Sequence, residues 1–266
     1  IQKNGGEDQV DIARSAYWRV FGNQKNGRAG AKTQIKNAAG SIEYRISCAY
    51  KGRVKPKYQP CSIDQMSQLL LHHPAIWTAL YRKEFLTKNN INFREVPGAG
   101  WVDNPFLIAS HCCGARLVYT DSALYNYREN GYAEAAAFAQ RQPKIPLERW
   151  NDMMDVVDAR NITSNVVLDA LTLRGINYAL LTKDALIWRE EHDAAGQIDS
   201  EVRDLLAKSF GRMDAKRVFE NPAISSTGKA LFAQVRGIAL PKDDKFSRYA
   251  YLAKEGFFRV KNDGIA

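Results

Sequence analysis

The chain of 266 residues is long enough for one large domain or two of ordinary size, and it can bury roughly three quarters of its unfolded surface without covalent staples. Hydrophobic residues make up 45% and charged residues 25%, as in an ordinary globular protein, and no apolar run approaches the roughly 18 residues of a membrane span. The four cysteines form no disulfide-dense pattern and no signal peptide opens the sequence, so we expect a cytoplasmic protein. Because the first residue is Ile1 rather than methionine, we expect a piece of a longer protein.

The first half alternates between strand-like and helix-like segments, the pattern of an α/β fold. Hydrophobic spacing and turn residues define each segment. In chain order they are a strand (10–21), an exposed loop (22–40), an extended stretch (41–50), a helix (63–72), a short apolar run (75–81), a helix (82–89), a strand (91–96), a tight loop (97–100), a helix (105–113) and two strands (116–120 and 123–128).

From about residue 134 onward, helical periodicity replaces the strand signals. We therefore expect two domains, residues 1–132 with an α/β sheet and residues 133–266 with a mainly α-helical fold. Toward the C-terminus, aromatic residues stand near basic ones. They either pack in the core or contact a membrane surface or a partner. The expected amphipathic faces are formed by Leu147, Trp150, Met154 and Val157, and by Val202, Leu205, Leu206 and Phe210.

The formal charge of +9 is concentrated in one segment, residues 19–57, where ten basic residues stand against the single acid Glu43. Such a segment attracts phosphates of a nucleotide, an anionic membrane, a polyanionic glycan or nucleic acid, or it is a solvated loop. Few aromatic residues are interleaved with the charges, so we expect no nucleic-acid partner.

An ordered set of motif residues occupies residues 73–128. A tryptophan segment leads through a strand to a Gly-rich loop, an acid that opens a helix, and a strand ending in Leu-Tyr-x-Tyr-Arg. The members are Pro74, Trp77, Tyr81, Arg82, Phe85, Leu86, Gly98, Gly100, Asp103, Leu124, Tyr125, Tyr127 and Arg128. This set resembles the C-terminal part of the catalytic domain of family-2 glycosyltransferases, enzymes of the GT-A (nucleotide-diphospho-sugar transferase) fold, especially bacterial ones that build surface polysaccharides.

The resemblance implies a partial GT-A-like sheet and an inverting, hexosyltransferase-type sugar transfer from a nucleotide-sugar donor to a glycan or lipid-linked acceptor. It places Asp103 at the position of the catalytic base, and a carboxylate held at a loop-to-helix junction suits that task. The alternative is that Asp103 or Asn104 caps a helix with Pro105 in its first turn, and the two roles are compatible. The family often has a second acid before this aspartate, where this chain has Val102.

The same resemblance places substrate contacts around this base. Trp101 either stacks on a sugar ring or anchors the loop, and Gly100 either lets the backbone approach a ligand or forms a tight turn. Arg128 either binds the donor diphosphate or forms a surface salt bridge. The full set of expected substrate-binding residues is Trp77, Arg82, Gly100, Trp101, Tyr127 and Arg128.

The family's nucleotide-binding half, with the D-x-D motif that holds Mg²⁺ or Mn²⁺, has no counterpart in this sequence. We expect that half upstream of Ile1, no metal site in this chain, and an inactive fragment. His111, Cys112 and Cys113 are consecutive on a predicted helix and point in different directions, so they predict no zinc site. The resemblance further implies work at the inner face of the membrane, as a peripheral contact. The alternative function is a non-catalytic binding module for an anionic partner that uses residues 19–57.

Overall fold

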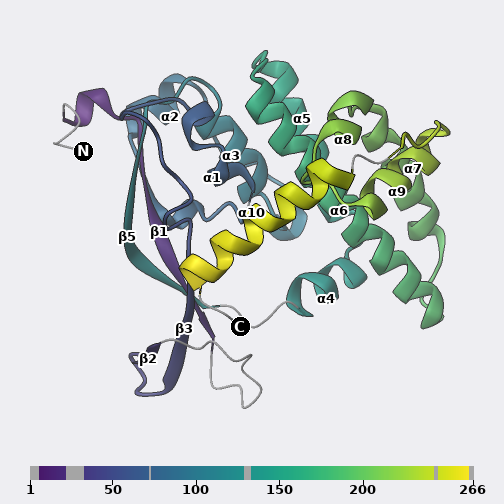
Figure 1. Cartoon of the computed structure of the whole chain (residues 1–266), viewed down its shortest axis with the longest axis horizontal. Coiled ribbons are helices and arrows are strands. Elements are labelled where there is room, and N and C mark those ends of the chain that lie inside the picture. Colours follow the sequence, from purple (N-terminus) through teal and green to yellow (C-terminus); the bar gives the residue numbers. More distant parts are fainter. Residues whose placement is uncertain (1–5, 22–32, 72, 129–132, 243–244, 264–266) are drawn as a thin grey trace. The chain divides into compact units, whose positions relative to one another are not determined.

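The structure is a computed structural model that describes residues 6–21, 33–71, 73–128, 133–242 and 245–263 (Figure 1). The expected mixed α/β class is confirmed, because a five-stranded sheet and a larger set of helices make up these residues. The chain divides into two compact units, neither of them continuous in sequence. The sheet unit comprises residues 1–90, 114–132 and 252–266, and the helical unit comprises residues 91–113 and 133–251.

The expected division at residue 132 coincides with one place where the chain passes between the units. Residues 91–113, expected in the first domain, group with the helices, whereas residues 252–266 group with the sheet.

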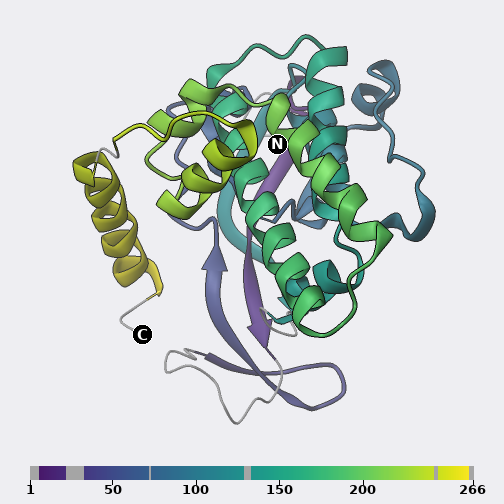
Figure 2. The same cartoon turned by 90° about the vertical axis from the view of Figure 1, so that its right-hand side faces the viewer.

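Strand β1 is the central element of the sheet. It pairs in parallel with β5, in antiparallel fashion with β3 near its C-terminal end, and in antiparallel fashion with β4 near its N-terminal end. Strand β2 forms the outer edge beside β3, and Figure 2 shows the hairpin of these two strands continuing from the end of β1. The strands are β1 (Ile12–Phe21), β2 (Thr33–Lys36), β3 (Ile42–Ala49), β4 (Ala79–Tyr81) and β5 (Leu117–Arg128).

Three strand predictions are wrong. The stretch 22–40 was expected as loop, yet it contains β2; its residues 22–32 lie outside the described residues. The two strands expected at 116–120 and 123–128 are one strand, β5, because both parts pair with β1 across a shift in register between Ser15 and Tyr17. Residues 91–96 form no strand; Arg94 instead pairs with Asp152 at 2.7 Å in the helical unit.

Short helices complete the sheet unit, and one side of β1 packs into its core. Ile12, Ala16, Leu70 and Leu117 are all fully buried there. The predicted helix 82–89 is confirmed as α2, and the predicted helix 63–72 is split into a 3-10 turn and a short α-helix. The elements are η2 (Glu7–Gln9), η3 (Ile63–Met66), α1 (Gln68–Leu71), η4 (Ile76–Thr78) and α2 (Lys83–Lys88).

A buried carboxylate, Asp11, ties β1 to two other segments of the sheet unit. It forms ion pairs with Arg82 and with Arg116, whose Nε lies 3.0 Å from Asp11 Oδ2, and it also accepts a hydrogen bond from the backbone N–H of Arg116. Burial alone raises the pKa of Asp11, but the hydrogen bonds from Arg116 and Arg82 outweigh it and hold the pKa below its ordinary value.

Asp11→Asn is expected to lower the free energy of unfolding by about 2 kcal/mol at neutral pH, because it leaves two cations without their carboxylate while both remain partly exposed to water. Since the folded-state pKa is lowered, this stabilisation is present above the unfolded pKa of about 4 and is lost as the pH falls through the folded value. Urea unfolding at several pH values measures it. The exposed Asp64→Asn is the control, and an equal effect of both variants would contradict the prediction.

The helical unit buries the amphipathic faces expected from the sequence. Leu147, Trp150, Val202 and Phe210 are each at most 1% exposed, so the helical assignment of this half is confirmed. Its elements are η5 (Pro97–Ala99), α3 (Asp103–His111), α4 (Ala133–Arg141), α5 (Ile145–Ala159), α6 (Asn165–Glu191), α7 (Gln197–Gly211), α8 (Ala215–Glu220) and α9 (Ser226–Arg236). The last helix, α10 (Lys245–Asp263), continues from this unit into the C-terminal segment of the sheet unit.

Trp150 is the centre of the helical core. Its indole N–H donates to the carbonyl of Leu171 at 2.8 Å, and its ring lies against Gly175 of α6. A Cβ at Gly175 would lie 2.5 Å from the indole nitrogen, so the helix needs glycine there for close approach. Among the described residues, no helix is long and apolar enough to cross a membrane.

Candidate functional site

Asp103 is the first residue of α3 and is half-buried. The helix is preceded by Val102, whose side chain cannot cap it, and neither Asp103 nor Asn104 makes a side-chain cap. The capping interpretation is therefore wrong. Asp103 instead places its charge in the first turn, where the helix dipole favours an anion, and Pro105 suits the same turn.

Asn104, which follows Asp103, fixes the connection between the Gly-rich loop and α3. Asn104 is 3% exposed, donates to the carbonyl of Trp101 at 3.1 Å and to Asp103 Oδ1 at 3.2 Å, and accepts a hydrogen bond from the Tyr178 hydroxyl at 2.8 Å. The same hydroxyl accepts from Arg174 Nε at 3.1 Å. The carboxylate of Asp103 is thus fixed through the loop on one side and through α6 on the other.

Trp101 has the contacts of a loop anchor. Its ring is stacked on Phe138 with centroids 5.8 Å apart, and it lies 5.1 Å from the ring of Tyr178. Its backbone is left-handed, with φ of 59°, a strained conformation for a large side chain. The residue is only partly buried.

The glycines of this loop have different roles. Gly98 has φ of 72°, in the left-handed region, and a Cβ there would meet nothing within 4 Å. Gly100 has an ordinary backbone, but a Cβ would lie 2.9 Å from Ile145 Cδ1 and 3.3 Å from Phe138 Cζ. Gly98 therefore serves the turn and Gly100 serves packing within the helical unit.

Trp77 and Tyr127 meet in the sheet unit. Their rings are stacked with centroids 4.5 Å apart, and Trp77 also stacks on Tyr125 at 4.3 Å. Tyr17 completes the cluster with an edge contact on Trp77 at 4.8 Å. Tyr125 is 43% exposed, so this aromatic cluster presents a ring to solvent.

Both arginines of the expected site are engaged by acids. Arg82 pairs with Asp11, and it lines a cavity of about 240 Å³. Arg128 pairs with Glu43, and the hydrogen bond from Asn37 together with this pair lowers the pKa of Glu43. The surface salt bridge expected as the alternative for Arg128 is present. A phosphate would have to compete with Glu43 for the guanidinium.

Arg128 nevertheless lines an open cavity of about 560 Å³ over the outer part of the sheet. The cavity contains cationic, amide and aromatic groups, which suit a phosphorylated or hydroxylated ligand. Lys36 was expected only as one cation of the basic segment 19–57, and Asn37 was not predicted, because both lie at the end of the unrecognised strand β2. Its lining includes Lys36, Asn37, Glu43, Tyr125, Tyr127 and Arg128.

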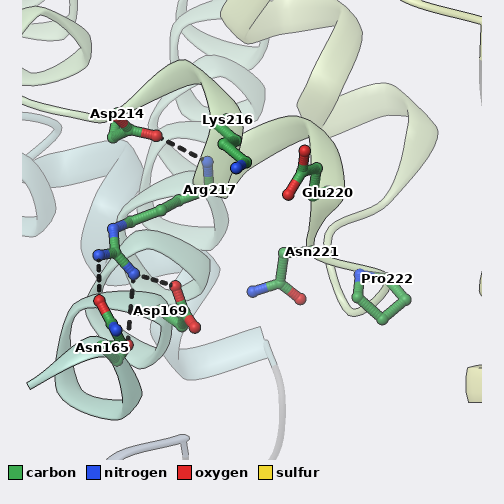
Figure 3. Close-up of a pocket in the computed structure, with 8 residues that line it drawn as sticks. All are labelled: Asn165, Asp169, Asp214, Lys216, Arg217, Glu220, Asn221 and Pro222. Atoms are coloured by element: carbon green, nitrogen blue, oxygen red, sulfur yellow. Dashed lines mark hydrogen bonds and ion pairs between the residues drawn. The ribbon is translucent and has the colours of Figure 1, made fainter.

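A third cavity, of about 680 Å³, lies among α6, α8 and the following turn of the helical unit (Figure 3). Arg217 reaches across it, with its two terminal nitrogens 2.6 Å from Asp169 Oδ1 and 2.6 Å from Asn165 Oδ1. Asp214 caps α8 through the backbone N–H of Arg217. The guanidinium of Arg217 therefore links α8 to α6, and its role is structural.

Two arginines of the basic segment have partners within the sheet unit. Arg53 pairs with Glu255, and Arg45 hydrogen-bonds Asn126 and lies over the ring of Trp18. Lys25, Arg28 and Lys32 lie outside the described residues. The exposed cations near its end are Lys51, Lys55 and Lys57.

The structure brings the expected residues together in two groups. Asp103, Trp101 and Gly100 share one loop of the helical unit, whereas Trp77, Tyr127, Arg128 and Arg82 belong to the sheet unit. Within the described ranges no group of three or more His, Cys, Asp and Glu side chains is placed to hold a metal ion.

Comparison with models of known protein families finds no match, and comparison with curated proteins finds none either. The family resemblance therefore depends on the motif residues between 73 and 128.

Proposed function

We propose that this chain is the acceptor-side part of an inverting GT-A glycosyltransferase of family 2, acting in bacterial cell-surface polysaccharide synthesis. The donor is a nucleotide sugar and the acceptor is a hydroxyl of a glycan or lipid-linked glycan. One observation carries the proposal: Asp103 opens α3 directly after the Gly-rich loop, half-exposed and fixed through Asn104, in the motif order of that family.

In this mechanism the Asp103 carboxylate accepts the proton of the acceptor hydroxyl while its oxygen attacks the anomeric carbon of the donor. The bond between that carbon and the diphosphate oxygen breaks, and the nucleoside diphosphate leaves with the bonding electrons. The rigid junction supports this step, because a base contributes most when it does not have to be ordered during the reaction. A part-exposed carboxylate is accessible to the incoming alcohol.

The aromatic cluster supports a carbohydrate ligand. Tyr125 presents a partly exposed ring, and aromatic faces pack well on the apolar face of a sugar. Arg128 and Lys36 in the neighbouring cavity provide the cations that a diphosphate or an anionic sugar requires.

A second candidate is a binding module for an anionic partner without catalysis. The exposed lysines 51, 55 and 57 favour it, because no acid is interspersed with them along the chain. Such a protein would bind anionic surfaces and consume no nucleotide sugar.

Sugar transfer by the full-length protein tests the proposal. The protein is incubated with a panel of radiolabelled nucleotide sugars, Mg²⁺ or Mn²⁺, and a glycan and glycolipid extract as the acceptor. We expect label from one donor to enter the extract, with an anomeric configuration opposite to that of the donor by NMR. Turnover of no donor, or retained configuration, would contradict it.

A further inference from the structure

Helix α10, yellow in Figure 1, exposes large apolar side chains along one face. Phe246, Tyr249, Phe257 and Val260 are 83%, 66%, 72% and 51% exposed. Their spacing of three, eight and three residues places all four on one side of an α-helix. Of the alternatives open for the C-terminal aromatic residues, a place in the core does not apply to the three rings of this set.

The opposite side of the C-terminal half of α10 packs within the sheet unit. Arg53 pairs with Glu255 at 2.9 Å, and its guanidinium lies 4.1 Å from the centroid of the Phe258 ring. Since Glu255 and Phe258 fall on the face away from Phe257, this contact fixes which side of α10 faces outward. The arrangement leaves the apolar face without a partner among the described residues.

Exposed cations lie on the helix that carries this face and on the segment packed against the other side of the helix. Lys245 and Lys254 are exposed on α10 itself, and the segment that holds the helix through Arg53 carries the exposed Lys51 and Lys55. Lys57 follows them, also exposed. Two acids of this region are already engaged, Glu255 by Arg53 and Asp121 by the amide of Gly52.

We propose that α10 is a membrane-surface helix that lies in the interface of an anionic bilayer, with Phe246 and Phe257 inserted among the lipids. Bulky aromatic residues beside lysines are the composition of such helices, and the charge of this surface complements anionic headgroups. A second copy of the chain fits less well, because two like-charged surfaces would meet and the middle of the face holds the small Ala253 and Gly256. This surface is independent of the proposed sugar transfer.

Co-sedimentation of the full-length protein with vesicles tests the proposal. Phosphatidylcholine vesicles with about one third phosphatidylglycerol should bind it at least about tenfold more strongly than phosphatidylcholine alone, and raising NaCl from about 0.05 M to about 0.5 M should release most of it. The double variant Phe246→Ser/Phe257→Ser should lose about tenfold or more in binding. Circular dichroism checks that the variant keeps the helix content of the wild type.

The matched control removes two equally exposed apolar residues elsewhere. Leu80 and Leu124 are 70% and 80% exposed, and Leu80→Ser/Leu124→Ser should bind vesicles like the wild type. Replacing Lys245 and Lys254, the exposed lysines of α10 itself, with Gln should reduce both the affinity and its salt dependence. The proposal would be overturned if the protein bound both kinds of vesicle equally, or if the Phe246/Phe257 variant bound vesicles like the wild type. It would also be overturned if the wild type formed dimers and bound no vesicles, and the variant lost the dimers. Asp103→Asn should leave vesicle binding intact, so failure here and failure of the proposed function are separable.

Discussion

Asp103→Asn in the full-length protein is expected to reduce sugar transfer by about 10²- to 10⁴-fold, the usual contribution of a general base. Asparagine has nearly the same shape and cannot accept the acceptor proton. Because Asp103 lies at the surface of the first turn and makes no cap, the variant should keep the fold. Donor binding should change little, because the lost interaction belongs to proton transfer.

Initial rates with the active donor measure the first effect, and equilibrium binding of the same donor measures the second. Glu84→Gln is the matched control, because Glu84 is likewise an acid in the first turn of a helix, α2, and is exposed. It should keep the wild-type rate. Wild-type turnover by Asp103→Asn would remove this residue from the role of base.

Trp150→Ala is expected to lower the free energy of unfolding of the protein by about 3–5 kcal/mol. The indole is 1% exposed, fills the space left by Gly175, and donates to the Leu171 carbonyl. Truncation creates a cavity and also removes the hydrogen bond that the indole N–H donates to the Leu171 carbonyl.

Urea or thermal unfolding followed by circular dichroism measures this loss. Trp188→Ala is the control, because Trp188 lies on α6, is only partly buried and stacks on the exposed His192. It should cost less than about 1 kcal/mol. If Trp150→Ala does not fold, Trp150→Phe replaces it in the experiment. This variant keeps an aromatic ring but not the hydrogen bond, and its free energy of unfolding should be lower by about 1 kcal/mol. Equal effects of the Trp150 and Trp188 variants would contradict the assignment of the core.

The helical unit could be predicted from the sequence because its signal is local. Leu147 and Trp150 recur at helical spacing, and the structure buries them together in α5. The sheet was harder, because strand pairing joins residues far apart in the chain. The sequence around residues 33–36 carries no sign that they will pair with β3. The sequence around residues 121–124 likewise carries no sign that both ends of β5 will pair with β1 as one continuous strand.

The candidate site shows the same limit. The acid at the start of α3 was predictable from the motif and from Pro105, since helix starts leave a local signature. The hydrogen-bond partner of Asn104 could not be predicted, because Tyr178 lies on α6, 74 positions further along the chain. The pairing of Arg128 with Glu43 was foreseen only as a generic salt bridge, since the identity of its acid depends on the register of β1 with β3 and β5.

The interleaving of the two units has a consequence for dissecting this protein. A single proteolytic cut releases neither unit, because the sheet unit is assembled from three stretches and the helical unit from two. A fragment that ends at residue 132 would carry α3, with Asn104 to His111 all buried against the helices, but would lack α5, on which α3 packs. The apolar surface of α3 would then be exposed to solvent, and the fragment would be prone to aggregate. An autonomous sheet unit therefore requires excision of residues 91–113 and attachment of the C-terminal segment by a new connection.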